Sequence, residues 1–202
     1  MSRMAGYAET IERLMAELGK LPGIGARSAE RLAFHILKSN RDEAMALAEA
    51  IRDVKTRIHP CKVCFNLTES EICNICANPR RERQTICVVE QPKDLLALEA
   101  TGSYRGVYHV LMGHIAPLEG VEAEDLTIDA LEARVRAGGV EEVILATNPT
   151  VAGDGTALHI ISLLEGSGVK LTRLARGLPS GGQIEYASKS ILTDAITERR
   201  DV

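Results

Sequence analysis

The sequence contains no tryptophan, and aromatic residues make up only 3% of its 202 positions. Surfaces that hold single-stranded nucleic acid by stacking need several exposed aromatic rings. This chain has too few aromatic residues to form such a surface, so we do not expect this mode of binding. The P-loop pattern G-x4-G-K-[S/T] is also missing, which argues against an ATPase of that type. With neither an apolar run of about 18 residues nor a start of signal-peptide type, we expect a cytoplasmic protein that does not enter a membrane.

Basic residues do not dominate either, because the net charge is −4. Nucleic-acid-binding domains are usually basic, so the distribution of charge matters more than its total. Residues 1–59 carry a net charge of +2, residues 60–100 carry −1, and residues 101–202 carry −5. Any nucleic-acid contact is therefore expected near the front of the chain, and it should be made to phosphates rather than to bases.

Three apolar patterns with helical spacing occupy the first 58 residues, at about 8–19, 26–38 and 42–58. Glycines and Pro22 separate the first pattern from the second. This part of the chain is predicted to be all helical. In the third helix the residues expected to face inward are Ala44, Leu47, Ala48, Ile51 and Val54.

From residue 85 onward, short apolar runs alternate with helical stretches. Expected strands cover 86–89, 107–112, 143–146 and 169–174, and expected helices cover 93–100, 128–137 and 156–164. This alternation predicts βα units around a parallel sheet. The tail is expected to add one strand at 183–187 and one helix at 191–199.

The predicted fold class is therefore α+β with several domains. We expect a helical domain over 1–59, a small cysteine-rich segment over 60–79, an α/β domain with a parallel sheet over 84–178, and a C-terminal strand and helix over 179–202. The 45% hydrophobic content is enough for a packed core.

Four of the five cysteines form the pattern C-x2-C-x8-C-x2-C. They are Cys61, Cys64, Cys73 and Cys76. Two such pairs can present four thiolates to one tetrahedral cation, and Zn²⁺ suits four sulfur ligands. Because four thiolates leave no open position, we expect one structural zinc per chain. An iron-containing occupant and disulfides are the alternatives. The fifth, Cys87, falls in an apolar strand and is predicted to be an ordinary buried thiol.

Between the first two helices lies the turn Leu21-Pro22-Gly23-Ile24-Gly25, a pattern typical of a helix-hairpin-helix. The glycines permit a tight turn, Ile24 can fill the space between the helices, and the amides that begin the next helix can receive a phosphate oxygen. The predicted DNA-binding residues are Lys20, Gly23, Gly25, Arg27 and Arg31. Alternatively, the hairpin is a structural turn or a contact for another protein.

In the α/β part, Glu90 ends one apolar strand and Asn148-Pro149-Thr150 follows another. These segments are similar to the two signature motifs of the Toprim domain, in which a glutamate and an Asp-x-Asp pair hold Mg²⁺ for phosphoryl transfer. Here Asn148 and Thr150 stand at the positions of the aspartates, so only Glu90 and Asp154 remain as acids. Mg²⁺ depends on carboxylates, so we expect a degenerate site without catalysis, in which Asn148 or Asp154 caps the next helix.

Read in order, several segments resemble the RecR family over roughly residues 8–199: L-P-G-I-G, C-K-V-C-F-N-L-T, T-I-C-V-V-E, A-T-N-P-T-V and R-G-L-P-S-G-G. This resemblance implies a helix-hairpin-helix, a zinc finger and a Toprim domain. It also implies DNA repair with the partner proteins RecO and RecF, and assembly into dimers or ring-shaped tetramers. At the positions of residues 150–157 the family commonly reads T-V-E-G-E-A-T-A. This chain has Ala152 in place of the first glutamate of that segment, so any role of that glutamate in partner or metal binding is in doubt here.

The leading hypothesis is thus a non-enzymatic DNA clamp or loading platform that binds DNA without regard to sequence. A metal-dependent Toprim phosphotransferase or nuclease is the alternative. A protein scaffold whose hairpin contacts a partner is the third.

Overall fold

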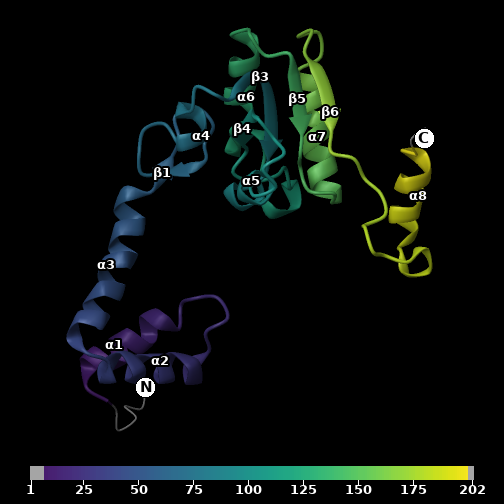
Figure 1. Cartoon of the computed structure of the whole chain (residues 1–202). Coiled ribbons are helices and arrows are strands. Elements are labelled where there is room, and N and C mark those ends of the chain that lie inside the picture. Colours follow the sequence, from purple (N-terminus) through teal and green to yellow (C-terminus); the bar gives the residue numbers. More distant parts are fainter. Residues whose placement is uncertain (1–6, 200–202) are drawn as a thin grey trace. The chain divides into compact units, whose positions relative to one another are not determined.

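The computed structural model describes residues 7–199 and divides the chain into two compact units, one up to Ile58 and one from His59 onward (Figure 1). The first unit is helical, as predicted. Its elements are α1 (Glu9–Leu18), α2 (Ala26–Lys38) and α3 (Arg41–Arg57).

Helices α1 and α2 form an αα-hairpin around small side chains. Ala29 and Ala33 of α2 are the buried residues of this pair, and their small size lets the two helices approach closely. The helix bounds agree with the apolar spacing because Gly19 ends α1 and Gly25 precedes α2.

Helix α3 corrects one expectation. Asn40 caps its start by accepting a hydrogen bond from the Glu43 amide at 2.8 Å, but no residue of the helix is buried. Leu47, Ile51 and Val54, which were predicted to face inward, are 49%, 61% and 60% exposed. The helix extends away from the α1–α2 hairpin, so its apolar face has no cover within residues 7–58 (Figure 1).

The second unit begins with a finger-like segment that has little regular structure. Its elements are β1 (His59–Pro60), β2 (Leu67–Thr68) and α4 (Asn74–Ala77), with β1 and β2 paired antiparallel. Its core consists of the four cysteines of the C-x2-C pairs, with Val63 and Ile75 packed against them. A segment with so few apolar contacts needs another source of stability.

The rest of the unit is an α/β domain. Its strands are β3 (Glu82–Val89), β4 (Gly106–Val110), β5 (Glu142–Leu145) and β6 (Lys170–Arg173); its α-helices are α5 (Pro92–Glu99), α6 (Ile128–Arg136) and α7 (Val151–Leu163), with short 3-10 turns η1 (Pro117–Glu119) and η2 (Ala123–Asp125). The four strands are parallel in the order β4-β3-β5-β6, which confirms the predicted parallel sheet.

Strand β3 shows why the sheet is covered on both faces. Ile86 and Val88 belong to one core cluster with α6 and α7, whereas Cys87 and Val89 belong to a second cluster with α5. Successive side chains of a strand point to opposite faces, so a continuously apolar strand lies between two layers. Cys87 is 3% exposed, as expected for a buried thiol.

The C-terminal segment contains η3 (Ile184–Tyr186) and α8 (Lys189–Thr197). The predicted helix is present, but residues 183–187 form a 3-10 turn instead of the predicted strand. Both Ile184 and Tyr186 are exposed, so no strand or core packs against this segment within the described chain.

Candidate functional site

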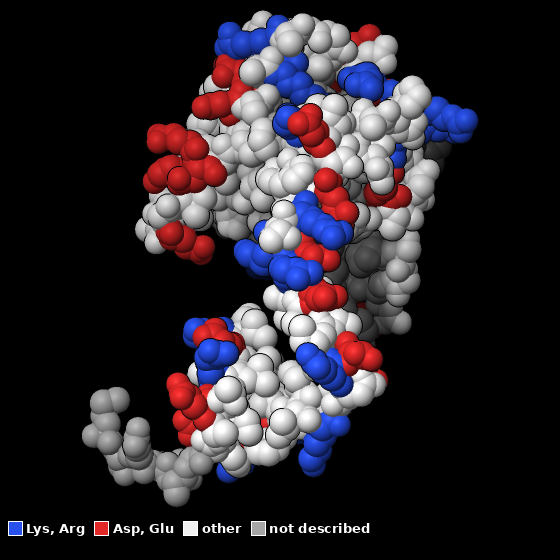
Figure 2. All heavy atoms as spheres, turned by 90° about the vertical axis from the view of Figure 1, so that its left-hand side faces the viewer, with Lys and Arg blue, Asp and Glu red and all other residues white. Residues whose placement is uncertain are grey.

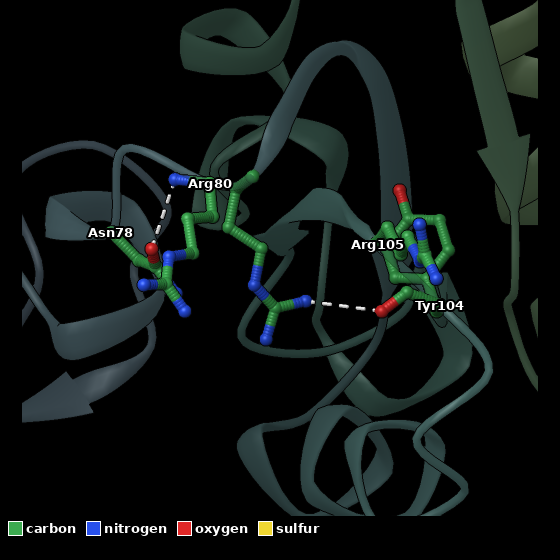
Figure 3. Close-up of a pocket in the computed structure, with 5 residues that line it drawn as sticks. Asn78, Arg80, Tyr104 and Arg105 are labelled. Atoms are coloured by element: carbon green, nitrogen blue, oxygen red, sulfur yellow. Dashed lines mark hydrogen bonds between the residues drawn. The ribbon is translucent and has the colours of Figure 1, made fainter.

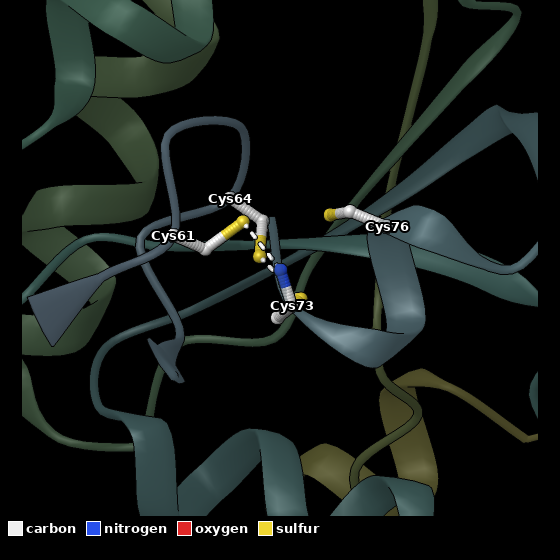
Figure 4. Close-up of side chains that lie close together, drawn as sticks. All are labelled: Cys61, Cys64, Cys73 and Cys76. Carbon is white, nitrogen blue, oxygen red and sulfur yellow. Dashed lines mark hydrogen bonds between the residues drawn. The ribbon is translucent and has the colours of Figure 1, made fainter. Parts of the chain in front are cut away.

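The four cysteines at 61, 64, 73 and 76 converge on one point. Their sulfur atoms all lie within 4.8 Å of one another, and every side chain is buried (Figure 4). A tetrahedron with Zn–S bonds of about 2.3 Å separates its sulfurs by about 3.8 Å. The arrangement therefore fits one structural zinc ion with four protein ligands, and leaves no position for a substrate.

Backbone amides prepare one of these sulfurs, Cys61 Sγ, for a cation. The Cys73 amide donates to Cys61 Sγ at 3.3 Å, and the Val63 amide donates to the same sulfur at 3.5 Å. Burial alone would raise the pKa of the Cys61 thiol, but these amides outweigh it and lower the pKa to about 7. A thiolate is the form that ligates a metal, so the amides around Cys61 favour metal binding. By contrast, a hydrogen bond with Cys76 and burial raise the pKa of the Cys64 thiol, and burial raises the pKa of the Cys73 thiol, so a bound cation would have to displace their protons.

The finger is attached to the edge strand of the sheet. The Val110 amide of β4 donates to the Cys64 carbonyl at 2.8 Å, so the first cysteine pair continues the hydrogen bonding of this strand. Next to it, the Phe65 ring meets the His109 ring edge-on, with 5.3 Å between the ring centroids, an arrangement that aromatic pairs favour. The finger and the sheet thus form one continuous structure.

The glycine turn joins α1 and α2 through a left-handed glycine and leaves the start of α2 open. Gly23 has φ +80°, a conformation that favours glycine, and Gly25 precedes the first turn of α2 with open space around its Cα. Ile24 is half-buried, and its place between the helices stays a prediction. The first turn of α2 contains no acidic residue, so its amides and the helix dipole present an uncompensated positive end.

The basic residues of the turn are not equivalent. Lys20 Nζ lies 2.7 Å from Glu17 Oε1, so its charge is compensated within α1 and the turn. Arg27 and Arg31 are exposed, and neither has an acidic partner among the ion pairs of residues 7–199. They stand one turn apart on α2, so both guanidinium groups are available beside the helix start.

At the carboxyl end of β3, the Glu90 carboxylate is 3% exposed and has protein donors on both oxygens. Oε1 accepts from the Asn148 backbone amide at 2.7 Å, and Oε2 accepts from Asn148 Nδ2 at 2.7 Å. His114 Nδ1 lies 3.2 Å from Oε2. The Asn148 side chain thus binds the acid that would otherwise face a metal ion.

Helix α7 approaches this pair closely. A Cβ at Gly153 would lie 2.1 Å from the Asn148 carbonyl oxygen and 2.7 Å from Glu90 Oε1, so no side chain fits there. Thr150 caps the helix, since its Oγ1 accepts from the Gly153 amide at 3.1 Å. The expectation that Asn148 or Asp154 caps α7 was therefore wrong: Asn148 binds Glu90, and Asp154 lies in the first turn of the helix.

The last acid, Asp154, is held by two arginines. Arg176 forms a bidentate ion pair with it, and Arg173 Nη2 donates to Oδ1 at 2.7 Å. Hydrogen bonds from Arg176 and Arg173 lower the pKa of Asp154 to about 2. Its charge is therefore compensated by arginines and is not directed at Glu90.

Three residues of this edge were missed by sequence reasoning: His114, Arg173 and Arg176. Each is distant in sequence from its acid, and the pairing depends on where β4 and β6 lie in the sheet. The only available signal was the position of Arg173 at the end of an expected strand, beside the carboxyl ends where such folds collect polar groups.

No helix among residues 7–199 combines the length and apolar character needed to cross a membrane.

Comparison with known proteins gives the same three parts. A family model described as RecR helix-hairpin-helix matches residues 11–55, a RecR four-cysteine zinc finger model matches 58–78, and a Toprim domain model matches 84–175. The chain is 54% identical over 197 residues to the recombination protein RecR of Rhodopirellula baltica, covering 98% of this chain and 99% of that protein. It is 55% identical over 199 residues to that of Rubrobacter xylanophilus, covering 98% and 100%.

Proposed function

The chain belongs to the RecR family of recombination proteins, and we propose that it is a non-enzymatic DNA-binding mediator of recombinational repair, acting as a clamp or loading platform. The observation that carries this proposal is the α2 start, where an acid-free helix end stands beside two uncompensated guanidinium groups, Arg27 and Arg31. Such a site recognises one phosphate and its neighbours without reading bases.

Each segment has its own task in this proposal. Residues 1–59 bind DNA through Lys20, Gly23, Gly25, Arg27 and Arg31; residues 60–79 hold zinc; residues 84–178 form a Toprim domain without catalysis; residues 179–202 add a C-terminal element. Lys20 contributes least, because Glu17 already compensates its charge.

The absence of catalysis is proposed from the donors around the acids. Two-metal phosphoryl transfer needs several carboxylates that point at the ions. Here Glu90 is bound by Asn148 and His114, and Asp154 by two arginines, so neither carboxylate is free to ligate Mg²⁺ without breaking those bonds. Replacing a carboxylate by the Asn148 amide also puts N–H donors where a cation would need an oxygen.

Self-assembly is part of the proposal, as a homodimer or a ring-shaped homotetramer. Basic and acidic side chains are interspersed on the face drawn in Figure 2, so a single copy offers few DNA contacts there. Several copies, each with one weak hairpin, would bind through avidity. The uncovered apolar face of α3 supports such an assembly, since exposed apolar stripes favour protein contacts.

RecO and RecF are the proposed partner proteins, and the cytoplasm is the proposed location of the protein.

The decisive experiment measures DNA affinity against salt concentration, by fluorescence anisotropy, for the full chain. The double variant Arg27→Ala/Arg31→Ala should bind more weakly, and the slope of log K against log salt should fall in magnitude by about 1.4 for single strands or about 1.8 for duplex. The matched control is Arg52→Ala/Arg57→Ala, which removes two cations of the same unit that already pair with Asp53.

An unchanged slope in the hairpin variant would contradict the proposal. An equal loss of DNA binding in the control variant would show that the loss comes from removing positive charge in general and not from the hairpin, and would also contradict it. In parallel, labelled DNA is incubated with the protein and Mg²⁺ or Mn²⁺. Cleavage that disappears in Glu90→Gln would favour a phosphotransferase or nuclease instead.

A further inference from the structure

A second group of arginines lies at the opposite end of the sheet from Glu90 and Asn148. A pocket of about 300 Å³ opens where the finger leads into β3 and where the chain enters β4. Its lining residues are Asn78, Arg80, Arg81, Tyr104 and Arg105. Asn78 and Arg80 lie on one side of the pocket, and Tyr104 and Arg105 lie on the other (Figure 3).

One of the three arginines is structural. Arg81 Nη1 donates to the carbonyl oxygens of Tyr104 and Gly106 at 3.2 and 3.3 Å, and Arg81 Nη2 forms an ion pair with Glu99. These bonds join the two chain segments, so Arg81 forms a fixed wall of the pocket, and most of its charge is compensated.

The other two cations are not compensated. Arg80 and Arg105 are exposed, and neither has an acidic partner among the ion pairs of residues 7–199. No acidic side chain is among the described residues that line the pocket. Two positive charges therefore face a common space, and such a space attracts an anion more strongly than isolated surface cations do.

The backbone that carries these cations is held in place. The Arg80 amide donates to Asn78 Oδ1 at 2.9 Å, which fixes the turn before β3. Next to Arg105, the Tyr104 hydroxyl lies 3.0 Å from the Thr85 carbonyl oxygen and 2.9 Å from that of Val107. Short, hydrogen-bonded connections therefore set the positions from which both guanidinium groups extend, which lowers the entropy lost when they bind a ligand.

We propose that this pocket binds phosphates of the DNA backbone, as a second contact besides the hairpin, and this inference rests on the proposed DNA-binding function. Arginine suits a phosphodiester because its planar fork donates two parallel hydrogen bonds. The pocket has no means to hold a base: the Tyr104 ring packs edge-on against Tyr108, and its hydroxyl faces carbonyl oxygens of the sheet. The chemistry is therefore that of backbone binding and not of nucleotide recognition.

The test compares salt-dependent DNA binding of the full chain with that of Arg80→Ala/Arg105→Ala. We expect weaker binding and a slope reduced in magnitude by about 1.4 to 1.8, the value for two lost phosphate contacts. Arg80→Lys/Arg105→Lys keeps the charges and should keep most of the slope. Both residues are exposed, and Arg81 is untouched, so zinc content and thermal unfolding should stay at wild-type values.

The control is Arg136→Ala/Lys170→Ala, which removes two exposed cations of the same unit that already pair with Glu132 and Glu142. An alanine pocket variant with the wild-type slope, while Arg27→Ala/Arg31→Ala still loses affinity, would overturn this inference and leave the proposed function intact. If the wild-type chain binds no DNA at low salt, both are overturned. If the pocket variant and the control lose the same DNA affinity, the loss reflects the overall decrease in positive charge, and the inference of a phosphate-binding pocket is overturned.

Discussion

Position 109 illustrates what one buried polar residue does in this protein. The His109 side chain is fully buried in β4, Nε2 lies 3.0 Å from the Thr127 carbonyl oxygen, and Nδ1 has no hydrogen-bond partner among residues 7–199. The ring must therefore be neutral, with the proton on Nε2. Burial, helped by the charge of Arg134, lowers the pKa of His109 to about 4.

We predict that this histidine makes the fold sensitive to mild acid. Because the folded pKa is below the unfolded value of 6.5, the unfolded chain binds more protons between these values, so stability is full above pH 6.5 and is lost as pH falls toward 4. The loss attributable to His109 should be roughly 1 to 1.5 kcal/mol by pH 5.5. Urea unfolding at pH 7.5 and 5.5 measures it.

The matched variant is His109→Gln, which can still donate a hydrogen bond to Thr127 but does not titrate. Protonation of the zinc ligands affects wild type and variant alike, so the difference between the two profiles isolates the histidine. Equal losses of stability in both proteins would contradict this prediction.

At the scale of elements, the finger depends on its metal, whereas the sheet does not. The finger core is made of the four cysteines with Val63 and Ile75, but the sheet has two separate apolar clusters on its faces. Binding energy at a structural zinc site of this kind is folding energy for the segment that carries the ligands.

We predict that Cys64→Ser lowers the zinc content from about one ion per chain to well below one, and opens residues 59–78 to proteolysis. The sheet should persist, because its apolar clusters remain. Colorimetric zinc determination and limited proteolysis measure the two effects. The control is Cys87→Ser, whose cysteine lies in β3 and is not a ligand. If the control Cys87→Ser loses as much zinc as Cys64→Ser does, the proposed set of four zinc ligands is wrong.

The elements also show what the sequence could predict. The helices and the parallel strands were predictable because their apolar spacing is regular and glycine or proline interrupts it, as at Gly19 and Gly25. The zinc ligands were predictable because four cysteines at that spacing have few other uses. The prediction of a strand at 183–187 was wrong, because an apolar pattern does not determine the conformation of a segment that packs against no neighbouring strand.

The polar edge of the sheet was only partly predictable. Glu90, Asn148, Thr150 and Asp154 could be located from their places after apolar strands. Their partners could not, because the pairing of Asp154 with Arg173 depends on β6 lying next to β5, and that strand order is a property of the whole sheet. Likewise, periodicity located the apolar face of α3 but said nothing about what covers it.

At the scale of the whole molecule, that uncovered face is the feature to explain. Leu47, Ile51 and Val54 follow one another at helical spacing, and each side chain is about half exposed or more. Burying such a side chain fully is worth roughly 1.5 to 3 kcal/mol, so leaving three of them in water is unfavourable unless another chain covers them. A second copy of this chain, offering the same stripe, is the occupant that the proposed assembly supplies.

We therefore predict that Ile51→Glu shifts the protein toward smaller species in sedimentation and lowers its apparent affinity for DNA, because avidity falls with the number of linked hairpins. The control is Met45→Glu, which places the same charge at an exposed apolar position on the opposite side of α3. Mass and affinity should change in the first variant and not in the second. If Ile51→Glu keeps the wild-type mass at the same concentration, α3 is not the contact between copies of this chain, and this prediction is wrong.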